Sequence, residues 1–264
     1  MDGVDVAAYD AVTMLYLYMN TKKPPLDDLH FRRALAYAFD YKTAAGLDWP
    51  GTKQSGGPVP AGLAGFNPAL TPYTLNLDKA KAELAQSKYA NQLDQYPIEF
   101  HWVTEVPDEE KIALLFQSNM SELGVKVEVV GTPWLTMTEL FTKVDTSPAL
   151  VPIYVNSDLP DAGALLYQRY DSKTTGTFFQ GEWLQDKTFD TGIEQALTIA
   201  DTTQRYTAYG ELEQYLMDAS PSIFVYDQLE KHAYRTCLDW PAAKGTVYPV
   251  MGYSNWGPII GVNC

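Results

Sequence analysis

The chain contains 264 residues, of which 46% are hydrophobic and 13% aromatic, and its formal net charge at pH 7 is −14. A chain of this size and apolar content can form one large domain or two small ones, which excludes a generally disordered protein. The negative charge repels phosphate backbones, so nucleic acid is not expected as a partner. Apolar runs are short and interrupted by proline, glycine or charge, which excludes a membrane-spanning segment.

The first element that the sequence predicts is a strand at residues 14–19, rich in aromatic and large apolar residues. Pro24 and Pro25 end this strand, and Asp27 and Asp28 offer carboxylates to the free N–H groups of a following helix. The apolar residues of that helix share one face: Phe31, Ala34, Leu35, Ala38 and Phe39. The pattern predicts a strand that delivers a helix to the core.

The rest of the chain alternates between predicted helices and strands. Residues 46–72 are rich in glycine and proline, which predicts an extended loop over the surface. Further strands are predicted at Ile98–Val103, 125–130, Leu150–Val155 and 222–226. Further helices are predicted at 108–123, 134–143, 161–170, 188–200 and Thr202–Ala219. This alternation indicates an α/β fold with a sheet flanked by helices.

The block at residues 20–42 also resembles a known family. Its quoted residues are Asn20, Thr21, Pro25, Asp27, Asp28, Arg32, Ala34, Leu35, Ala38 and Asp40. In this order they are similar to the start of the C-terminal lobe in solute-binding proteins of peptide and nickel ABC importers. The similarity continues in family order through residues 58–68, 77–89, 121–130 and 201–226. It therefore covers most of the chain.

The resemblance implies the C-terminal lobe of a type II periplasmic-binding-protein-like fold, with a mixed sheet flanked by helices. Residues 14–264 would form this single substrate-binding lobe, and residues 1–13 would be a remnant of the hinge or of cloning. The N-terminal lobe of the family has no counterpart in the sequence. The start of the chain also lacks the features of a signal peptide, so we expect an excised piece or a processed protein. Family members are periplasmic proteins or surface lipoproteins.

Residues 154–163, YVNSDLPDAG, follow the predicted strand Leu150–Val155, and ligands of open α/β sheets bind outside strand ends. In peptide-binding members of the family, the matching segment carries an Asp that pairs with the α-amino group of the peptide. The resemblance places Asp158 in that role, with Asp161, Tyr154 and Asn156 as further ligand-binding candidates. Val155 stands where those members have a Trp. The alternative is that Asp158 caps a turn and Asp161 caps the next helix.

Cys237 and Cys264 are the two cysteines, and an exported chain could join them in a disulfide. Two unpaired thiols are the alternative. The sequence contains no nucleophile elbow, zinc-protease, dinucleotide or phosphate-loop motif, and its three histidines are far apart. No enzyme, metal or cofactor is therefore expected.

The expected function is the solute-binding component of an ABC importer, which captures oligopeptides in a two-lobed cleft and delivers them to a membrane permease. An oligosaccharide or a nickel chelate is the alternative solute within the same family. Two other classes stay open. A hydrolase could use Asp158 and Asp161 as a carboxylate pair, and an interaction module could dock a basic partner protein through its acidic surface.

Overall fold

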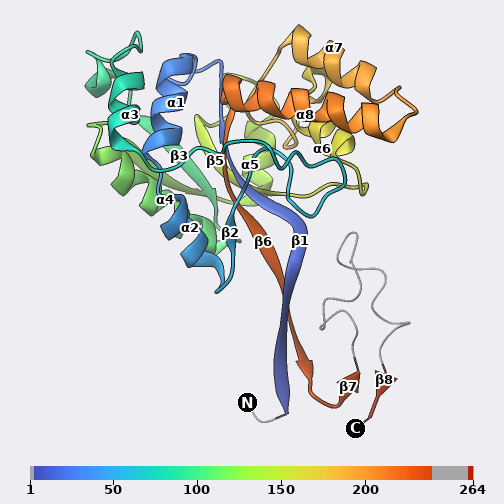
Figure 1. The fold of residues 1–264 in the computed structure, drawn as a ribbon. Coiled ribbons are helices and arrows are strands. Elements are labelled where there is room, and N and C mark those ends of the chain that lie inside the picture. Colours follow the sequence, from blue (N-terminus) through green and yellow to red (C-terminus); the bar gives the residue numbers. More distant parts are fainter. Residues whose placement is uncertain (1–2, 240–260, 264) are drawn as a thin grey trace.

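The computed structural model describes residues 3–239 and 261–263, and Figure 1 shows how they are arranged. The larger sheet consists of β1 (Val4–Met19), β2 (Lys53–Gln54), β3 (Ile98–Val103), β4 (Val127–Thr132), β5 (Leu150–Val155) and β6 (Ser222–Arg235). Its strand order is β2-β6-β1-β5-β3-β4. Strand β1 is antiparallel to β5 and β6, whereas β3 is parallel to β4 and β5, so the sheet is mixed. A second, small sheet pairs β7 (Leu238–Asp239) with β8 (Gly261–Val262).

Helices cover both faces of the larger sheet. They are α1 (Leu29–Ala38), α2 (Tyr41–Asp48), α3 (Leu77–Leu84), α4 (Pro107–Ser121), α5 (Trp134–Leu140), α6 (Ala162–Tyr170), α7 (Lys187–Ala196) and α8 (Thr202–Ala219). Short 3-10 turns lie at Leu93–Gln95 and Ser172–Thr174. In Figure 1 the first four helices gather on one side of the sheet and the last four on the other.

The two faces of β1 enter two different cores, because side chains alternate along a strand. Leu15, Leu17 and Met19 join the core beneath α1 to α4. Met14, Tyr16 and Tyr18 join the core beneath α5 to α8. The aromatic and branched residues that predict this strand are therefore buried on both sides, as expected for a strand in the middle of a covered sheet.

Several predicted elements are confirmed as the sequence places them. Strands Ile98–Val103 and Leu150–Val155 and helix Thr202–Ala219 have the predicted bounds. Asp28 caps α1, and its carboxylate accepts the N–H of Phe31 at 2.8 Å. The remaining predicted helices shift by a few residues at their ends, where helix boundaries are least well defined by sequence.

Arg32 ties the start of α1 to the end of α8. Its guanidinium donates to the carbonyl oxygens of Leu26 at 2.8 Å, Ala219 at 2.8 Å and Ser220 at 2.9 Å. The residue is 8% exposed, and burial lowers the pKa of its guanidinium to about 10. Arg32, one of the residues that carry the family resemblance, is thus a structural residue in this fold.

Strands β1 and β6 leave the body of the sheet together as a two-stranded ribbon, seen at the bottom of Figure 1. The ribbon pairs residues 4–10 with residues 229–235, and an irregularity between Asp10 and Met14 separates it from the rest of β1. The sequence predicts strands at 14–19 and 222–226, so the predicted start of β1 and the predicted end of β6 are wrong. The two segments bond to each other away from the core, and charged residues such as Asp5, Asp10 and Glu230 interrupt their apolar residues, which weakens the pattern on which the prediction depends. The assignment of residues 1–13 as a hinge stays a prediction.

The predicted surface loop at 46–72 is more deeply embedded than expected. It begins within α2 and contributes β2 to the edge of the sheet, where Lys53 and Gln54 pair with β6. Val59 is fully buried in the core beneath α5 to α8. Within residues 3–239 and 261–263, none of the helices has the length and apolar character needed to cross a membrane.

Candidate functional site

One end of the sheet, where the ribbon leaves, carries a row of residues in register. Lys53 on β2 faces Asp227 on β6, and Asp227 pairs with Met14 on β1. Met14 pairs in turn with Val155, the last residue of β5. We call these four residues the rim. Ligands of open α/β sheets bind outside strand ends, so the rim and the loops beside it are the natural site.

The rim loop, residues 156–161, follows β5 directly at this end. Asn156 and Asp158 are exposed, whereas Ser157 is buried. The Ser157 hydroxyl contacts the backbone of the loop, donating to the carbonyl of Asp161 at 3.4 Å. The Asp158 carboxylate accepts one hydrogen bond from the side-chain amide of Gln168 at 3.0 Å. Asp158 therefore presents a negative charge to solvent in the rim loop while one neighbouring amide orients it.

Asp161 occupies the N-cap of α6 instead of facing outward. Its carboxylate accepts the N–H of Gly163 at 2.9 Å and lies 3.9 Å from the guanidinium of Arg205. Both contacts satisfy this side chain within the fold. The helix-capping alternative for Asp161 thus has direct geometric support, and its ligand-binding role stays a prediction.

Tyr154 lies on the opposite face of the sheet from the rim loop. Its ring packs against the core beneath α1 to α4, and its hydroxyl lies 2.8 Å from that of Tyr226. Burial raises the pKa of the Tyr154 phenol. The fold brings Asn156, Asp158 and Asp161 together in one loop but does not bring Tyr154 to them. The alternation of side chains along β5 is the reason, since Val155 and Tyr154 point to different cores.

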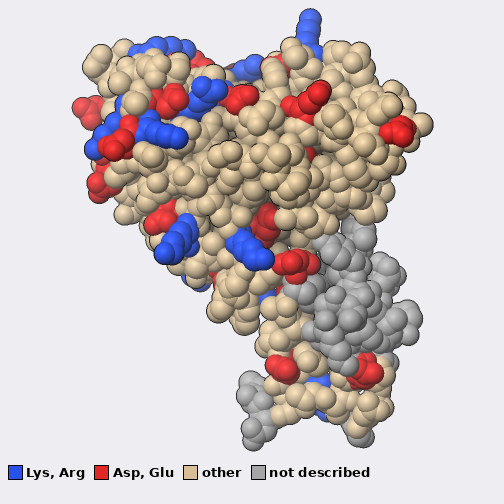
Figure 2. Space-filling model, viewed as in Figure 1, with Lys and Arg blue, Asp and Glu red and all other residues tan. Residues whose placement is uncertain are grey.

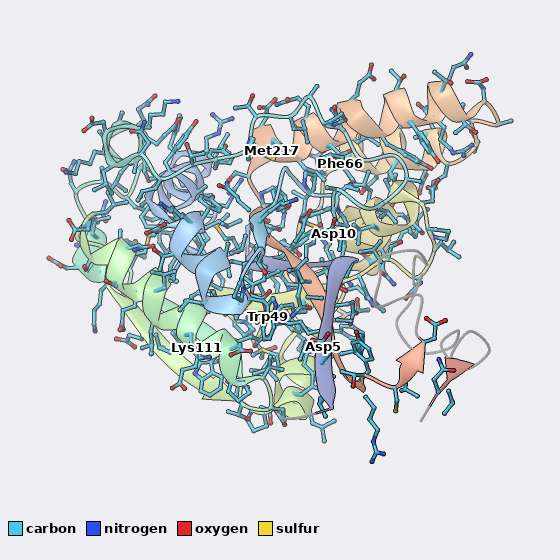
Figure 3. The ribbon with its side chains drawn as sticks, turned by 60° about the horizontal axis from the view of Figure 1, so that its bottom comes forward. Asp5, Asp10, Trp49, Phe66, Lys111 and Met217 are labelled. Atoms are coloured by element: carbon cyan, nitrogen blue, oxygen red, sulfur yellow. The ribbon has the colours of Figure 1, made fainter. Side chains whose placement is uncertain are left out.

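The reasoning from sequence missed Asp227, a second carboxylate at the rim. It lines a hollow of about 300 Å³ together with Asp10, Lys53 and Ala61. Its carboxylate accepts the N–H of Ala61 at 3.0 Å, and burial raises its pKa. Figure 3 shows Asp10 on β1 where the ribbon meets the body. The signal for Asp227 in the sequence was its position as an acidic residue directly after the apolar run 222–226. Two carboxylates and one ammonium give the hollow a net negative character that suits hydrogen-bond donors.

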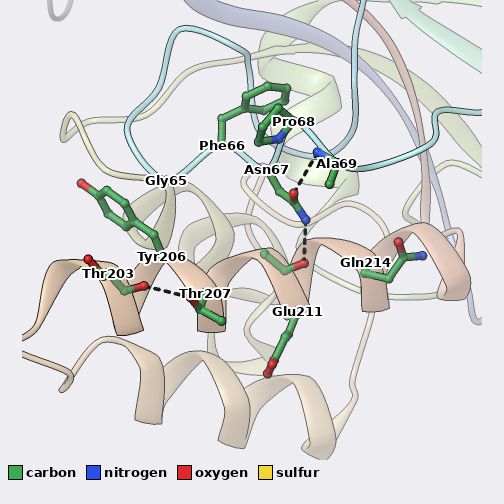
Figure 4. A pocket seen from close by; sticks show the side chains of 11 residues that line it. Gly65, Phe66, Asn67, Pro68, Ala69, Thr203, Tyr206, Thr207, Glu211 and Gln214 are labelled. Carbon is green, nitrogen blue, oxygen red and sulfur yellow. Dashed lines mark hydrogen bonds between the residues drawn. The ribbon is translucent and has the colours of Figure 1, made fainter.

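A larger hollow of about 820 Å³ lies between residues 65–69 and α8 (Figure 4). Asn67 bridges the two, donating to the carbonyl of Gly210 at 3.3 Å and accepting the N–H of Ala69 at 3.0 Å. Its other lining side chains include the exposed carboxylate of Glu211 and the amide of Gln214. The hollow is open and carries little charge, so the rim has the stronger chemistry for binding a charged solute.

Within the described ranges, no three residues among His, Cys, Asp and Glu are grouped so that they could hold a metal ion.

The backbone N–H of Asn263 donates to the carbonyl of Cys237 at 2.9 Å. Cys264 lies outside the described residues, so its pairing with Cys237 stays a prediction.

On the face seen in Figure 2, acidic and basic side chains are interspersed. That face therefore gives no support to an acidic docking surface for a basic protein.

Residues 1–177 match the family model described as "Bacterial extracellular solute-binding proteins, family 5 Middle". The chain is 26% identical over 226 residues to the probable D,D-dipeptide-binding periplasmic protein DdpA of Escherichia coli strain K12, covering 85% of this chain and 43% of that protein. It is 23% identical over 256 residues to heme-binding protein A of Haemophilus influenzae, covering 95% of this chain and 45% of the relative. The chain thus spans less than half the length of these relatives.

Among solved structures, the dipeptide binding protein from Pseudoalteromonas sp. SM9913, in complex with Met-Leu, superposes with a TM-score of 0.79. The identity is 20%, and the match covers 90% of this chain and 47% of that one. At this identity the similarity concerns the fold alone. It confirms the predicted fold class, an α/β unit equivalent to part of a type II periplasmic binding protein.

Proposed function

Because the chain belongs to family 5 of the bacterial extracellular solute-binding proteins, we propose that it forms one lobe of the solute-binding component of an ABC importer. A second lobe would join it through the β1–β6 ribbon and would close over the rim. The share of the relatives that the chain covers, below one half, supports a single lobe. The component would act outside the cytoplasm and present its solute to a membrane permease.

We propose that the solute is a peptide. A relative named for D,D-dipeptides and a structural neighbour with bound Met-Leu support this choice. The exposed carboxylate of Asp158 supports it most directly, because an α-ammonium that leaves water needs a charge-assisted partner. Across the described residues, Asp158 takes part in no ion pair within 4.0 Å of a basic group, so its charge remains available.

The role proposed here involves binding and closure without a chemical reaction. A carboxylate pair of Asp158 and Asp161 has little support, since Asp161 caps α6 and contacts Arg205 while Asp158 contacts Gln168. Peptide binding would stabilise the closed arrangement of two lobes, and the permease would respond to that arrangement. This lobe alone supplies half of such a cleft, so we expect the 264-residue chain by itself to bind peptides weakly.

A thermal-shift screen of the two-lobed protein tests the proposal, because a ligand that binds the folded state raises its melting temperature. The screen would compare dipeptides and tripeptides with oligosaccharides and with nickel chelates. We expect peptides to raise the melting temperature in a concentration-dependent way. A shift with sugars or nickel chelates and none with peptides would overturn the peptide assignment.

A further inference from the structure

Strand β1 is irregular at the point where the ribbon leaves the body of the sheet. Asp10 pairs with Leu229 and Met14 pairs with Asp227, so residues 11–13 of β1 lie opposite Gln228 alone. We call residues 11–13 the bulge. Extra residues in one strand of an antiparallel pair interrupt the ladder of hydrogen bonds and let that strand bend. The bulge is therefore the place where the ribbon can change its direction relative to the body.

An ion pair connects the ribbon to the body on the far side of the bulge. Lys231 lies in the ribbon, where it pairs with Ala8, and its ammonium is 2.6 Å from the carboxylate of Asp48. Asp48 is the last residue of α2, a helix whose buried residues belong to the core beneath α1 to α4. Figure 3 shows Trp49, the next residue, beside the ribbon. The contact thus spans the bulge and ties the outer part of the ribbon to α2.

This ion pair is enclosed, unlike a surface pair. The side chain of Asp48 is 2% exposed and that of Lys231 is 26% exposed. The second carboxylate oxygen of Asp48 accepts the hydroxyl of Thr52 at 2.7 Å, and the ring centre of Trp49 lies 5.9 Å from the ammonium. The last turn of a helix disfavours a carboxylate, so α2 itself gives no reason for Asp48. An enclosed pair is weakly screened by salt, and losing one partner is costly.

We propose that Asp48, Lys231 and Trp49 form a brace that holds the ribbon in one direction across the bulge. A further consequence rests on the proposed function, in which the ribbon joins this lobe to the second one. The brace then limits the swing of the second lobe, and its three members are positioning residues for closure of the cleft. Without the brace, the ribbon adopts more directions at the bulge, and peptide binding must order them at a cost in affinity.

Hydrogen exchange of the two-lobed protein, followed by mass spectrometry, tests the brace. In Lys231→Met we expect the amides of residues 4–13 and 228–235 to exchange about tenfold faster or more, and those of β5 and α8 to change by less than about twofold. The double variant Lys231→Met with Asp48→Asn guards against misfolding, because it leaves no buried charge without its partner. It should show the same pattern.

Lys111→Met is the matched control for the exchange experiment. It breaks a 2.7 Å ion pair with Asp108 on α4, in which both side chains are more than half exposed. Exposed pairs contribute little, so we expect no change in the exchange of the ribbon. Unchanged ribbon exchange in Lys231→Met would overturn the brace. Equal acceleration in the ribbon, β5 and α8 would also overturn it, because that result indicates a general loss of stability.

Calorimetric titration of the same variants with Met-Leu tests the role in closure. We expect the dissociation constant to rise about threefold or more in both brace variants. Lys231→Arg keeps the positive charge and should bind Met-Leu as the unmodified protein does. Faster ribbon exchange with unaltered affinity for Met-Leu would overturn the role in closure. If the unmodified protein binds no peptide, the proposed function and the role in closure both fail, and the exchange result decides the brace separately.

Discussion

The segment at residues 20–40 and the rim loop at residues 156–161 both carry conspicuous polar residues, but they use them differently. Asn20 is fully buried and donates to the carbonyls of Val144 and Ser147 at 3.3 and 3.5 Å. Arg32 likewise satisfies three backbone carbonyls in the interior. Asp158, in contrast, is exposed and holds one amide. The segment that most strongly indicates the family contributes to the packing of the fold, whereas the loop leaves a carboxylate exposed to solvent.

The largest expected effect is a loss of stability in the segment at residues 20–40. Arg32→Ala would leave two buried carbonyls and one partly buried carbonyl without their donor, and we expect the free energy of unfolding to fall by about 3 kcal/mol or more. Chemical denaturation monitored by circular dichroism measures it. Arg33→Ala is the control, because this neighbouring residue bonds the carbonyl of Asp218 at the exposed surface and should cost about 0.5 kcal/mol or less. Equal losses of unfolding free energy in the two variants would contradict the structural role assigned to Arg32 alone.

A second prediction concerns Glu109, whose buried carboxyl accepts the N–H of Val103 at 2.8 Å. Burial raises its pKa from the ordinary 4.5 to about 8. The stability linked to this group is therefore fully present below about pH 4.5 and is lost as the pH rises towards 8.

Glu109→Gln keeps an acceptor for that N–H but cannot ionise. We expect the loss of unfolding free energy between pH 5 and pH 8 to shrink by about 1–3 kcal/mol. Glu110→Gln, at the exposed neighbouring position, should leave the pH dependence unchanged. Denaturation at several pH values would measure both variants, and parallel curves for the unmodified protein and Glu109→Gln would rule out a titrating Glu109.

The rim loop also contains one structural and one exposed carboxylate, Asp161 and Asp158, and the expected effects are smaller. Asp161→Ala removes the N-cap of α6 and the contact with Arg205, and we expect it to lower the free energy of unfolding by about 1 kcal/mol. Asp158→Ala should change it by about 0.5 kcal/mol or less, since that side chain is exposed. Urea denaturation of both variants makes the comparison. A larger loss at Asp158 would assign it a structural role instead.

A small effect on stability is also expected at Tyr154. Tyr154→Phe removes the hydroxyl contact with Tyr226, and we expect the free energy of unfolding to fall by about 0.5–1 kcal/mol. Peptide affinity should not change, because the ring faces the core beneath α1 to α4. A loss of affinity without a loss of stability would return Tyr154 to the ligand site.

Sequence reasoning recovered the elements that are buried in the body of the fold. Strand β5 and helix α8 have their predicted bounds because apolar periodicity and helix-end residues act locally. The ribbon was missed, since strands that pair outside a core need no apolar pattern. In the candidate site, the loop after β5 was found from its place after a strand. Asp227 was missed, because its position beside Met14 depends on pairing between distant strands.

The most direct test of the account is a comparison of Met-Leu with its N-acetylated form, titrated into the two-lobed protein and into its Asp158→Asn variant. Acetylation removes the ammonium that Asp158 is proposed to bind. We expect the unmodified protein to prefer the free peptide about tenfold or more, and Asp158→Asn to abolish this preference by weakening the free peptide alone. An undiminished preference in Asp158→Asn would show that another group binds the ammonium and would contradict the central assignment.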